Sequence, residues 1–336
     1  MKCFVTGASG FIGSNLVQEL LARGHRVKVL LRPKADEHGL LGLKYERVTG
    51  DLTDRRLLER ELEGCDWCFH LAASVHLWLR NYAPMHETNV EGTRNVILAA
   101  GRAGCQKIIH CSTAGCIGQL KAKDGTILPA TESEKISDAQ LCNDYLRSKF
   151  RAEAVALELF RKQGLPVIIV NPSAPVGPGD AKPTPTGQFI VDFLNRRLPA
   201  YINTGLNWVP VRDVAIGHIL AAEKGHIGER YILGNQEGNW TLAQTLAVLE
   251  EVSGVPAPRK IIPRWIALRL AEMSEYKAKV TRRPPKVSLA AIRMTRYKMW
   301  YDSGKAIREL GLPQTPPKEA FAEAVRWFRH NNFVKK

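Results

Sequence analysis

The sequence predicts an α/β protein in which helices cover both faces of a doubly wound parallel sheet, followed by a smaller, mainly helical domain. In the first half of the 336-residue chain, short apolar runs alternate with stretches of helical periodicity. Strands that alternate with helices are typical of βαβ units and a parallel sheet. After residue 172 the pattern changes to helices joined by proline-rich segments, which predicts a second unit.

The predicted elements follow the chain in order. Strands are expected at residues 2–6, 27–31, 45–49, 66–70, 107–112 and 166–170, and helices at 11–23, 54–62, 85–103 and 143–163. Residues 171–187 contain five prolines and three glycines, which predicts a structured loop at the carboxyl edge of the sheet. Residues 209–218 and 229–233 are expected to return to the sheet, and residues 237–336 to form helices.

The first strand runs directly into a glycine-rich turn that opens a helix, with Gly7, Gly10 and Gly13 in the spacing of a dinucleotide site. In this pattern the first glycine makes the tight turn, the second lets the backbone approach a pyrophosphate, and the third lets helix and strand pack closely. The helix N-terminus offers N–H groups and the positive end of its dipole to phosphates. A Rossmann domain is therefore predicted at residues 1–172, with its sheet completed by about 208–235. Residues 173–207 and 236–330 are assigned to a substrate-binding region, and 331–336 to a tail.

The chain is basic, with 48 Lys and Arg against 33 Asp and Glu, a formal net charge of +15. Residues 259–305 hold 13 basic and 3 acidic residues, a difference of +10. An anionic cofactor, an anionic substrate, a membrane surface or simply a solvated basic face would account for this segment. No nucleic-acid-reading motif accompanies the charge, so no nucleic-acid partner is predicted.

The location expected for the protein is cytoplasmic. No stretch reaches the roughly 18 apolar residues of a membrane span, and the first strand begins too early to leave room for a signal peptide. The seven cysteines lack zinc-site spacing, so we expect reduced thiols and no metal. Residues 263–270 are apolar with flanking arginines, which favours a core-facing helix and leaves peripheral contact with the inner membrane face as the alternative.

Tyr145 and Lys149 lie four residues apart in a predicted helix. Positions i and i+4 share a helix face, so the lysine ammonium can favour the phenolate and lower the pKa of the tyrosine. Such a tyrosine can act as a general acid or base on a carbonyl or hydroxyl. The strand at 107–112 is followed directly by Thr113, whose hydroxyl can hold a substrate oxygen at the rim of the cofactor crevice.

Taken together, these motifs resemble the extended short-chain dehydrogenase/reductase superfamily across nearly the whole chain. Residues 6–13, 50–54, 70–73, 89–93 and 171–173 carry the resemblance. It implies that Tyr145 is the acid or base, Lys149 its helper and Thr113 the catalytic hydroxyl residue, while Asn89 supports their geometry. With Arg32, which is considered below, the implied cofactor contacts are Gly7, Ser9, Gly10, Phe11, Ile12, Gly13, Arg32, Asp51, Leu52, Leu71, Ala72, Ala73, Lys149, Pro172 and Ser173.

Within that superfamily, the chain is most similar to bacterial proteins called hopanoid-associated sugar epimerases, which are often labelled dihydroflavonol-4-reductase-like. Residues 76–80, 145–150, 182–187, 203–207 and 228–234 carry this closer similarity. The resemblance implies an NAD(P)-dependent dehydrogenase, reductase or epimerase. It also implies a homodimer formed through the helices at 85–103 and 143–163.

The end of the second strand favours NADP(H) as the cofactor. An NAD enzyme usually carries an acid here to bind the ribose hydroxyls, whereas this strand ends at Leu31 followed by Arg32. A guanidinium can bind a 2′-phosphate through two hydrogen bonds, and a carboxylate would repel it. Asp36 and Glu37 lie close in the sequence and can still serve a ribose, so NAD(H) remains open.

Aromatic residues suggest the substrate class. His76, Trp78 and Trp208 are predicted to line, with the catalytic residues, a pocket for a bulky ring system; ordinary packing is the alternative. We rank hydride transfer at a secondary alcohol or ketone of a terpenoid, steroid or flavonoid-like molecule first. Nucleotide-sugar epimerisation by the same triad ranks second, with Arg293 or Arg296 on the diphosphate. A non-catalytic nucleotide-binding sensor is the third hypothesis.

Overall fold

The computed structural model describes residues 1–335, and its centre is a seven-stranded parallel sheet. The strand order is β11-β8-β5-β4-β1-β2-β3, so the order reverses at β1 and β4, as in a doubly wound dinucleotide-binding fold. This architecture confirms the predicted fold class. The strands are β1 (Lys2–Thr6), β2 (Arg26–Leu31), β3 (Glu46–Thr49), β4 (Trp67–His70), β5 (Lys107–Cys111), β8 (Val167–Pro172) and β11 (Arg230–Leu233).

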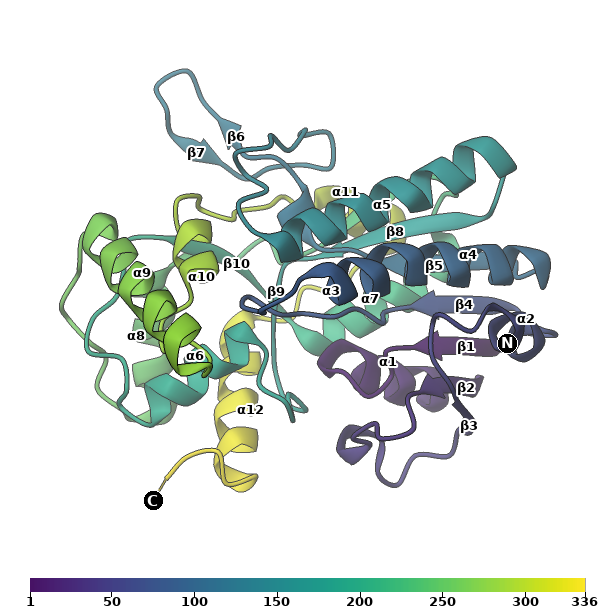
Figure 1. The fold of residues 1–336 in the computed structure, drawn as a ribbon, viewed down its shortest axis with the longest axis horizontal. Coiled ribbons are helices and arrows are strands. Elements are labelled where there is room, and N and C mark those ends of the chain that lie inside the picture. The colour runs from purple at the N-terminus through teal and green to yellow at the C-terminus, as the bar shows by residue number, and fades with distance from the viewer. Residues whose placement is uncertain (336) are drawn as a thin grey trace.

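Helices cover both faces of this sheet, because successive strand residues point to opposite sides (Figure 1). On β1, Val5 packs with α1 (Phe11–Ala22) and α7 (Val211–Lys224), whereas Phe4 packs with the helices of the other face. Those helices are α2 (Arg55–Leu62), α4 (Gly92–Arg102) and α5 (Asp144–Gln163). A short helix α3 (Ala83–His86) and a π-helical turn at Glu87–Glu91 precede α4 and replace the continuous helix predicted at 85–103.

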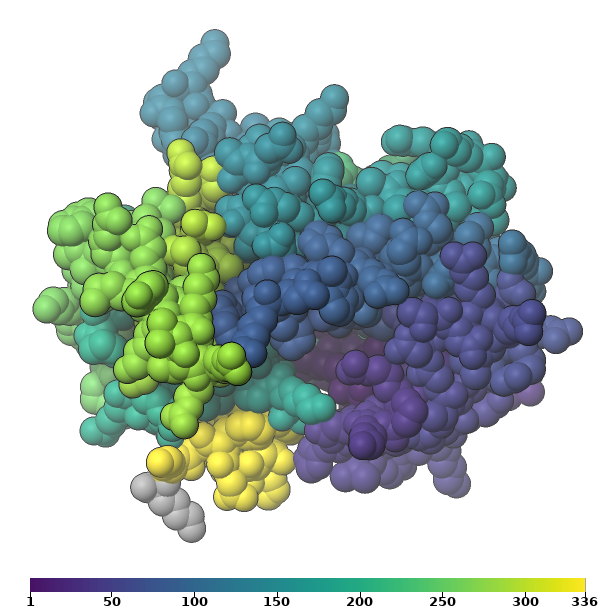
Figure 2. Space-filling model, viewed as in Figure 1, coloured from purple at the N-terminus to yellow at the C-terminus, as the bar shows by residue number. Residues whose placement is uncertain are grey.

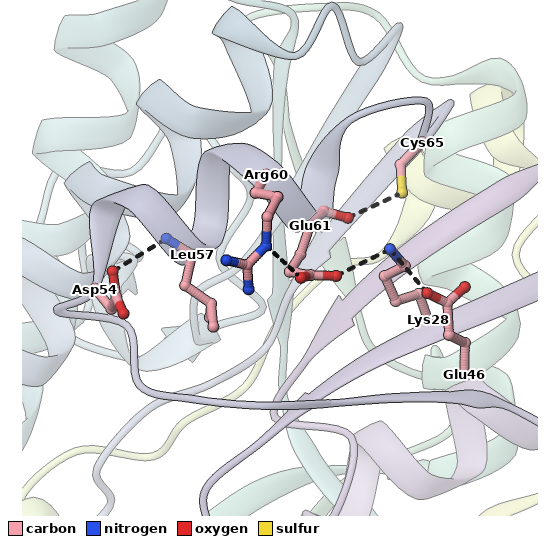
Figure 3. Close-up of polar contacts among 7 residues, drawn as sticks. All are labelled: Lys28, Glu46, Asp54, Leu57, Arg60, Glu61 and Cys65. Carbon is pink, nitrogen blue, oxygen red and sulfur yellow. Dashed lines mark hydrogen bonds and ion pairs between the residues drawn. The ribbon is translucent and has the colours of Figure 1, made fainter.

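A buried lysine ties the edge of the sheet together (Figure 3). Lys28 on β2 is almost fully buried, and its Nζ lies 2.9 Å from Glu46 on β3 and 3.1 Å from Glu61 on α2. The N-terminus of α2 is capped by Asp54, which accepts a hydrogen bond from the backbone of Leu57. These contacts fix β2, β3 and α2 relative to one another, next to the loop that follows β2.

The prediction that residues 209–218 return to the main sheet is wrong. Strand β10 (Gly205–Pro210) belongs to a separate three-stranded sheet, and α7 begins at once after it. Only β11 completes the main sheet, beside β8. A short apolar run fits a buried strand and a buried helix equally well, and here the helix forms.

Residues 171–187 are only partly the loop that their prolines predict. Strand β8 extends to Pro172, β9 (Ala174–Val176) follows, and α6 (Pro185–Leu194) begins before the segment ends. β9 lies at the edge of the three-stranded sheet, where the donor missing from Pro175 costs little. Pro185 occupies the first turn of α6, a position that needs no N–H partner.

The C-terminal part is mainly helical, as predicted. It contains α8 (Leu242–Ser253), α9 (Arg264–Thr281), α10 (Leu289–Met294), α11 (Gly304–Leu310) and α12 (Pro317–His330), together with the unpredicted strand β12 (Asn239–Thr241). A hairpin of β6 (Leu120–Lys121) and β7 (Ile127–Leu128) projects from the molecule (Figure 1). All seven cysteines are free thiols. Within residues 1–335, none of the helices has the length and apolar character needed to cross a bilayer.

A buried histidine on α7 should make the fold sensitive to acid. His218 is fully buried, its Nδ1 bonds the carbonyl of Val214, and burial lowers its pKa to about 4. Because the unfolded state binds this proton near pH 6.5, stability is lost as the pH falls from about 6.5 toward 4. We expect His218→Asn, whose amide can keep the bond, to remove about 2 kcal/mol of the stability difference between pH 7.5 and pH 5. Urea unfolding at both pH values measures this, and the exposed His226→Asn should leave the pH dependence unchanged.

Candidate active site

The glycine turn between β1 and α1 has the shape of a phosphate cradle. Gly7 has a φ of +72°, and a Cβ there would lie 2.5 Å from the backbone nitrogen of Ala72. A Cβ on Gly13 would lie 2.1 Å from the carbonyl oxygen of Gly7, so both positions require glycine. A Cβ on Gly10 would meet only that same oxygen, at 3.2 Å, with open space beyond. The backbone at the start of α1 is therefore accessible to a pyrophosphate, and the turn fits a dinucleotide.

A buried hydrogen-bond chain links this turn to the loop after β4. The backbone of Ala72 donates to Thr6 Oγ1 (3.2 Å), and Thr6 Oγ1 lies 2.8 Å from Nδ1 of His70. Nε2 of His70 lies 3.0 Å from Thr93 Oγ1, which donates to the carbonyl of Asn89. Burial lowers the pKa of His70 to about 3, so the ring is neutral at pH 7. Because the Thr93 hydroxyl already donates to Asn89, it accepts from His70, and the ring proton is therefore assigned to Nε2. The Thr6 hydroxyl then donates to Nδ1, and this hydrogen-bond chain holds the loop at Leu71–Ala73 against the glycine turn.

Asn89 lies in the π-helical turn and bridges two segments of the site. Its Oδ1 accepts from the backbone of Ser74 (2.7 Å), and its Nδ2 donates to the carbonyl of Ser74 (3.0 Å) and to Ser148 Oγ (2.8 Å). Ser148 is on α5 and in turn donates to the carbonyl of Tyr145. Because every polar atom of its amide is used, Asn89 positions the loop after β4 against the helix that carries Tyr145 and Lys149.

The structure places Thr113, Tyr145 and Lys149 around one end of the sheet. Lys149 is buried, and its ammonium donates to the carbonyl of Cys111 at the end of β5 (2.7 Å). Thr113 follows Ser112, and its Oγ1 accepts from the backbone of Gly115 (3.2 Å), which leaves the hydroxyl proton free to point elsewhere. α5 begins at a capping Asn143, so Tyr145 lies in the first turn of the helix.

The pKa of Tyr145 does not move in the direction expected from Lys149. Burial raises it, and the thiols of Cys116 and Cys111 act in the same direction. Among residues 1–335, the Tyr145 hydroxyl makes no hydrogen bond. The phenol is therefore protonated at neutral pH in this structure, which is the form that a general acid requires.

A buried carboxylate on α5 ties this helix to the neighbouring strands, and sequence reasoning missed it. Glu153 on α5 is almost fully buried and accepts hydrogen bonds from Ser112 (2.5 Å), Asn171 (2.9 Å) and Arg230 (3.0 Å). Asn171 also donates to the carbonyl of Thr113 (3.0 Å). The signal was present in the sequence, because Glu153 follows Lys149 by the same four residues that separate Lys149 from Tyr145.

The end of β2 is open to an added anion. Leu31 is buried in the core, and Arg32 is exposed at the start of the following loop. Within residues 1–335, its guanidinium takes part in no hydrogen bond or ion pair. Glu37 is already engaged, since it accepts from Tyr45 (2.6 Å) and Arg47 (3.1 Å), and Asp36 lies 3.7 Å from Lys182.

The other predicted cofactor residues lie along the same carboxyl edge of the sheet. Asp51 and Ser9 are exposed, whereas Leu52 and Pro172 are buried. Ser173 donates its backbone N–H to the carbonyl of Leu233 on β11 (3.1 Å). Partly exposed positions complete the set: Phe11, Ile12, Leu71, Ala72 and Ala73.

Of the predicted substrate residues, Trp208 is a correction. Its side chain is buried, its indole N–H donates to Thr245 (2.9 Å), and its ring packs edge-on against Phe321. This tryptophan therefore belongs to the core of the C-terminal part, and its ring is not exposed to a substrate. His76 and Trp78 lie in the loop that follows β4, where His76 is exposed and Trp78 is half-buried.

A narrow pocket of about 30 Å³ lies beside Thr113, and the wall that residues 294–301 contribute to it was not predicted. A Cβ on Gly115 would lie 3.5 Å from Thr113 Oγ1 and 3.6 Å from Met299 Cε, so this pocket adjoins the threonine. It continues into a wider, more polar hollow that includes Arg296. The lining is largely apolar and includes Ile117, Ile136, Leu146, Met294, Tyr297, Met299, Trp300 and Tyr301.

The fold and this site define an enzyme class: a dinucleotide-dependent protein with a Tyr/Lys/Thr group at the crevice. Residues 3–234 match the model of the NAD dependent epimerase/dehydratase family. The chain belongs to this family. Its members and homologues are NAD(P)-dependent reductases, epimerases and dehydratases of the extended short-chain dehydrogenase type, and the chain is an enzyme of this type.

Three relatives indicate the range of the family. The chain is 42% identical to a protein of Synechocystis sp. named "Putative dihydroflavonol 4-reductase", over 99% of this chain and 96% of the relative. It is 38% identical to "Sterol demethylase protein B" of Methylococcus capsulatus, over 99% and 100%. The solved dTDP-glucose 4,6-dehydratase of Streptomyces venezuelae, with NAD and TYD bound, is 27% identical, with a TM-score of 0.77 and coverage of 99% and 98%.

Proposed function

We propose that this enzyme is an NADP(H)-dependent oxidoreductase that transfers hydride at a secondary alcohol or ketone of a bulky, apolar substrate. The observation that carries the proposal is the apolar wall of Leu146, Met299 and Trp300, which lies next to Thr113 at the end of β5. The pocket of about 30 Å³ behind this wall has room for little more than water, so a ring system would lie along the wall in the crevice or widen the pocket on binding. An apolar ring system suits such a wall better than a sugar, which needs many hydrogen-bonding partners.

We assign the three residues the roles that the resemblance to the extended short-chain dehydrogenase/reductase superfamily implies. The nicotinamide, when bound, supplies or accepts the hydride. Thr113 donates its hydroxyl proton to the substrate oxygen, and Tyr145 delivers a proton to that oxygen during reduction. Lys149 is anchored on the carbonyl of Cys111, so its remaining N–H groups are available to a ribose and to the tyrosine. In the oxidative direction, the same tyrosine removes the proton.

Relatives support both a reductase and an apolar substrate. One relative is named as a dihydroflavonol 4-reductase and another as a sterol demethylase protein. A third, 30% identical over 97% of this chain, is a ketoreductase of a farnesyl-bearing quinoline oxide from Stigmatella aurantiaca. All three names describe molecules with a large apolar skeleton.

A nucleotide-sugar epimerase is the second candidate, and one observation favours it. Arg296 lines the polar hollow next to the pocket, where its guanidinium is exposed and suited to a diphosphate. The dTDP-glucose dehydratase among the structural neighbours shows that this fold accepts such substrates.

Product analysis separates the two candidates. The purified enzyme is supplied with NADPH and, in separate reactions, with sterol or terpenoid ketones, a dihydroflavonol and UDP-sugars. We expect oxidation of NADPH with formation of the alcohol from one of the apolar ketones. Isomer formation from a UDP-sugar without net cofactor consumption would instead establish the epimerase.

Cofactor choice is tested at Arg32. A charge-assisted hydrogen bond is worth about 1.5–3 kcal/mol, so Arg32→Ala should weaken NADPH binding about 10- to 100-fold. NADH binding should change little, because that cofactor has no 2′-phosphate. Fluorescence titration with both cofactors measures the effect, and Arg26→Ala, at the opposite end of β2, is the matched control. Tighter binding of NADH than of NADPH by the unaltered enzyme would overturn the NADP(H) assignment.

A further inference from the structure

Helix α9 turns its large apolar side chains outward. The face that packs on the protein consists of small residues, with Ala267, Ala271 and Ala278 buried. On the opposite side, Trp265 is 67% exposed and Tyr276 is 73% exposed. This is the reverse of an ordinary surface helix, whose large apolar residues face the core. The prediction that residues 263–270 face the core is therefore wrong for their large side chains Trp265 and Leu270, although Ala267 is buried.

The exposed apolar side chains of this part of the chain are here called the α9 face, and the exposed ion pair Arg269–Glu272 lies among them, because Arg269 is four residues from both Trp265 and Met273. The α9 face comprises Ile261, Trp265, Leu270, Met273, Tyr276 and Val280, each at least 50% exposed. The spacing of Trp265, Met273, Tyr276 and Val280 keeps them on one side of the helix, over about 22 Å at 1.5 Å per residue. The helix lies at the outer end of the molecule, away from the main sheet (Figure 1), and its segment stands at the surface at the left of Figure 2.

Basic residues cluster at the C-terminal end of the α9 face and are largely uncompensated. Lys277, Lys279, Arg282, Arg283 and Lys286 are exposed, and none of them forms an ion pair among residues 1–335. The two acidic residues on the helix leave these cations unpaired: Glu272 pairs with Arg269 of the same helix, and Glu275 accepts from the backbone of Leu289. The patch therefore combines exposed apolar area with a local excess of positive charge.

The charge decides which partner fits. In a symmetric dimer this face would meet its own copy, and the basic residues of one chain would oppose those of the other. Nucleic acid would satisfy the charge, and its bases could stack on Trp265 and Tyr276, but it offers no counterpart to the exposed aliphatic side chains of Leu270, Met273 and Val280. An anionic lipid surface satisfies both, because the apolar side chains enter the boundary of the acyl chains while Lys and Arg contact phosphates.

We propose that the α9 face docks this enzyme peripherally on an anionic membrane surface. α9 is tied to the first residue of α10 by a hydrogen bond from Leu289 N to Glu275 Oε1 (3.2 Å), and the chain from the end of α10 onward forms the Met294–Tyr301 wall of the pocket beside Thr113. The docked surface thus lies next to the segment that lines the pocket. An apolar substrate dissolved in the bilayer would enter on this side; that consequence rests on the proposed function, whereas lipid binding does not.

Vesicle co-sedimentation of the full chain tests the proposal. We expect binding to vesicles of phosphatidylcholine mixed with phosphatidylglycerol, weaker binding to phosphatidylcholine alone, and loss of binding as salt is added. Replacing Trp265 and Met273 together by Ser should reduce the bound fraction at least about tenfold, because two large apolar side chains no longer enter the lipid. Leu41→Ser is the matched control, since Leu41 is 71% exposed but lies in the loop after β2.

Two control measurements separate lipid binding from loss of folding and from loss of activity. Thermal unfolding verifies that the double variant is folded, and activity on a water-soluble ketone with NADPH tests the reaction separately from lipid binding. Equal binding by the double variant and Leu41→Ser would overturn the proposal. So would a concentration-dependent dimer, seen by analytical ultracentrifugation, that the Trp265 and Met273 substitutions abolish, because the face would then be a contact between copies.

Discussion

Replacing Tyr145 by Phe should lower kcat by about 10²- to 10⁴-fold, the usual contribution of a positioned general acid. The substitution removes only the hydroxyl, which has no hydrogen-bond partner among residues 1–335, so it leaves no buried group unsatisfied. Folding stability and cofactor affinity should therefore stay close to those of the unaltered enzyme. The loss should appear in kcat and kcat/KM alike, because the proton transfer occurs in the transition state.

Steady-state kinetics on the substrate identified by product analysis measures this effect. Tyr201→Phe is the control: Tyr201 is half-buried in the C-terminal core, and its side chain also makes no hydrogen bond among residues 1–335. Undiminished turnover in Tyr145→Phe would remove the tyrosine from the mechanism. Fluorescence titration with the cofactor should accompany the kinetics, since lost binding would indicate a structural rather than a chemical role.

The parts of this enzyme that follow from local rules could be predicted from the sequence. The strand, glycine turn and helix at the N-terminus were placed to within one residue, because each glycine meets a steric demand of the turn itself. The i and i+4 spacing of Tyr145 and Lys149 survives in α5 because it is a property of any α-helix. The sequence predicted that Lys149 lowers the pKa of Tyr145, whereas burial raises it. Burial depends on tertiary packing and could not be predicted from the helix spacing.

Features that depend on distant partners could not be predicted. Trp208 was assigned to a pocket, yet Phe321, more than a hundred residues away, covers its ring. The Met294–Tyr301 wall comes to the site only because this distant segment bridges to Leu206 on β10 and to Ala130. α9 illustrates the same limit, because periodicity shows that a helix has an apolar side but not whether that side faces the protein. The alanines at 267, 271 and 278 were the available signal, since small residues let a helix approach its neighbour closely.

The stability of the site should depend strongly on Glu153. Its carboxylate is buried and receives three hydrogen bonds, from Ser112 on the β5 side, Asn171 on β8 and Arg230 on β11. Removing one partner of a buried ion pair leaves the other charge without compensation, which typically costs about 3–5 kcal/mol. We expect Glu153→Ala to lower the free energy of unfolding by about that amount. Glu153→Gln should cost less, because its amide oxygen can still accept from Ser112 and Asn171 while its NH₂ opposes Arg230.

Urea unfolding of both variants measures the loss, with Glu158→Ala as the matched control on the same helix. Glu158 forms an exposed pair with Lys162, so its removal should cost less than about 0.5 kcal/mol. Because Asn171 binds both Glu153 and the carbonyl of Thr113, Glu153→Ala should also lower kcat under conditions in which the variant is fully folded. Rescue of that activity by Glu153→Gln would identify Glu153 as a positioning residue. A stability of Glu153→Ala equal to that of Glu158→Ala would contradict the view that this carboxylate holds the three strands to α5.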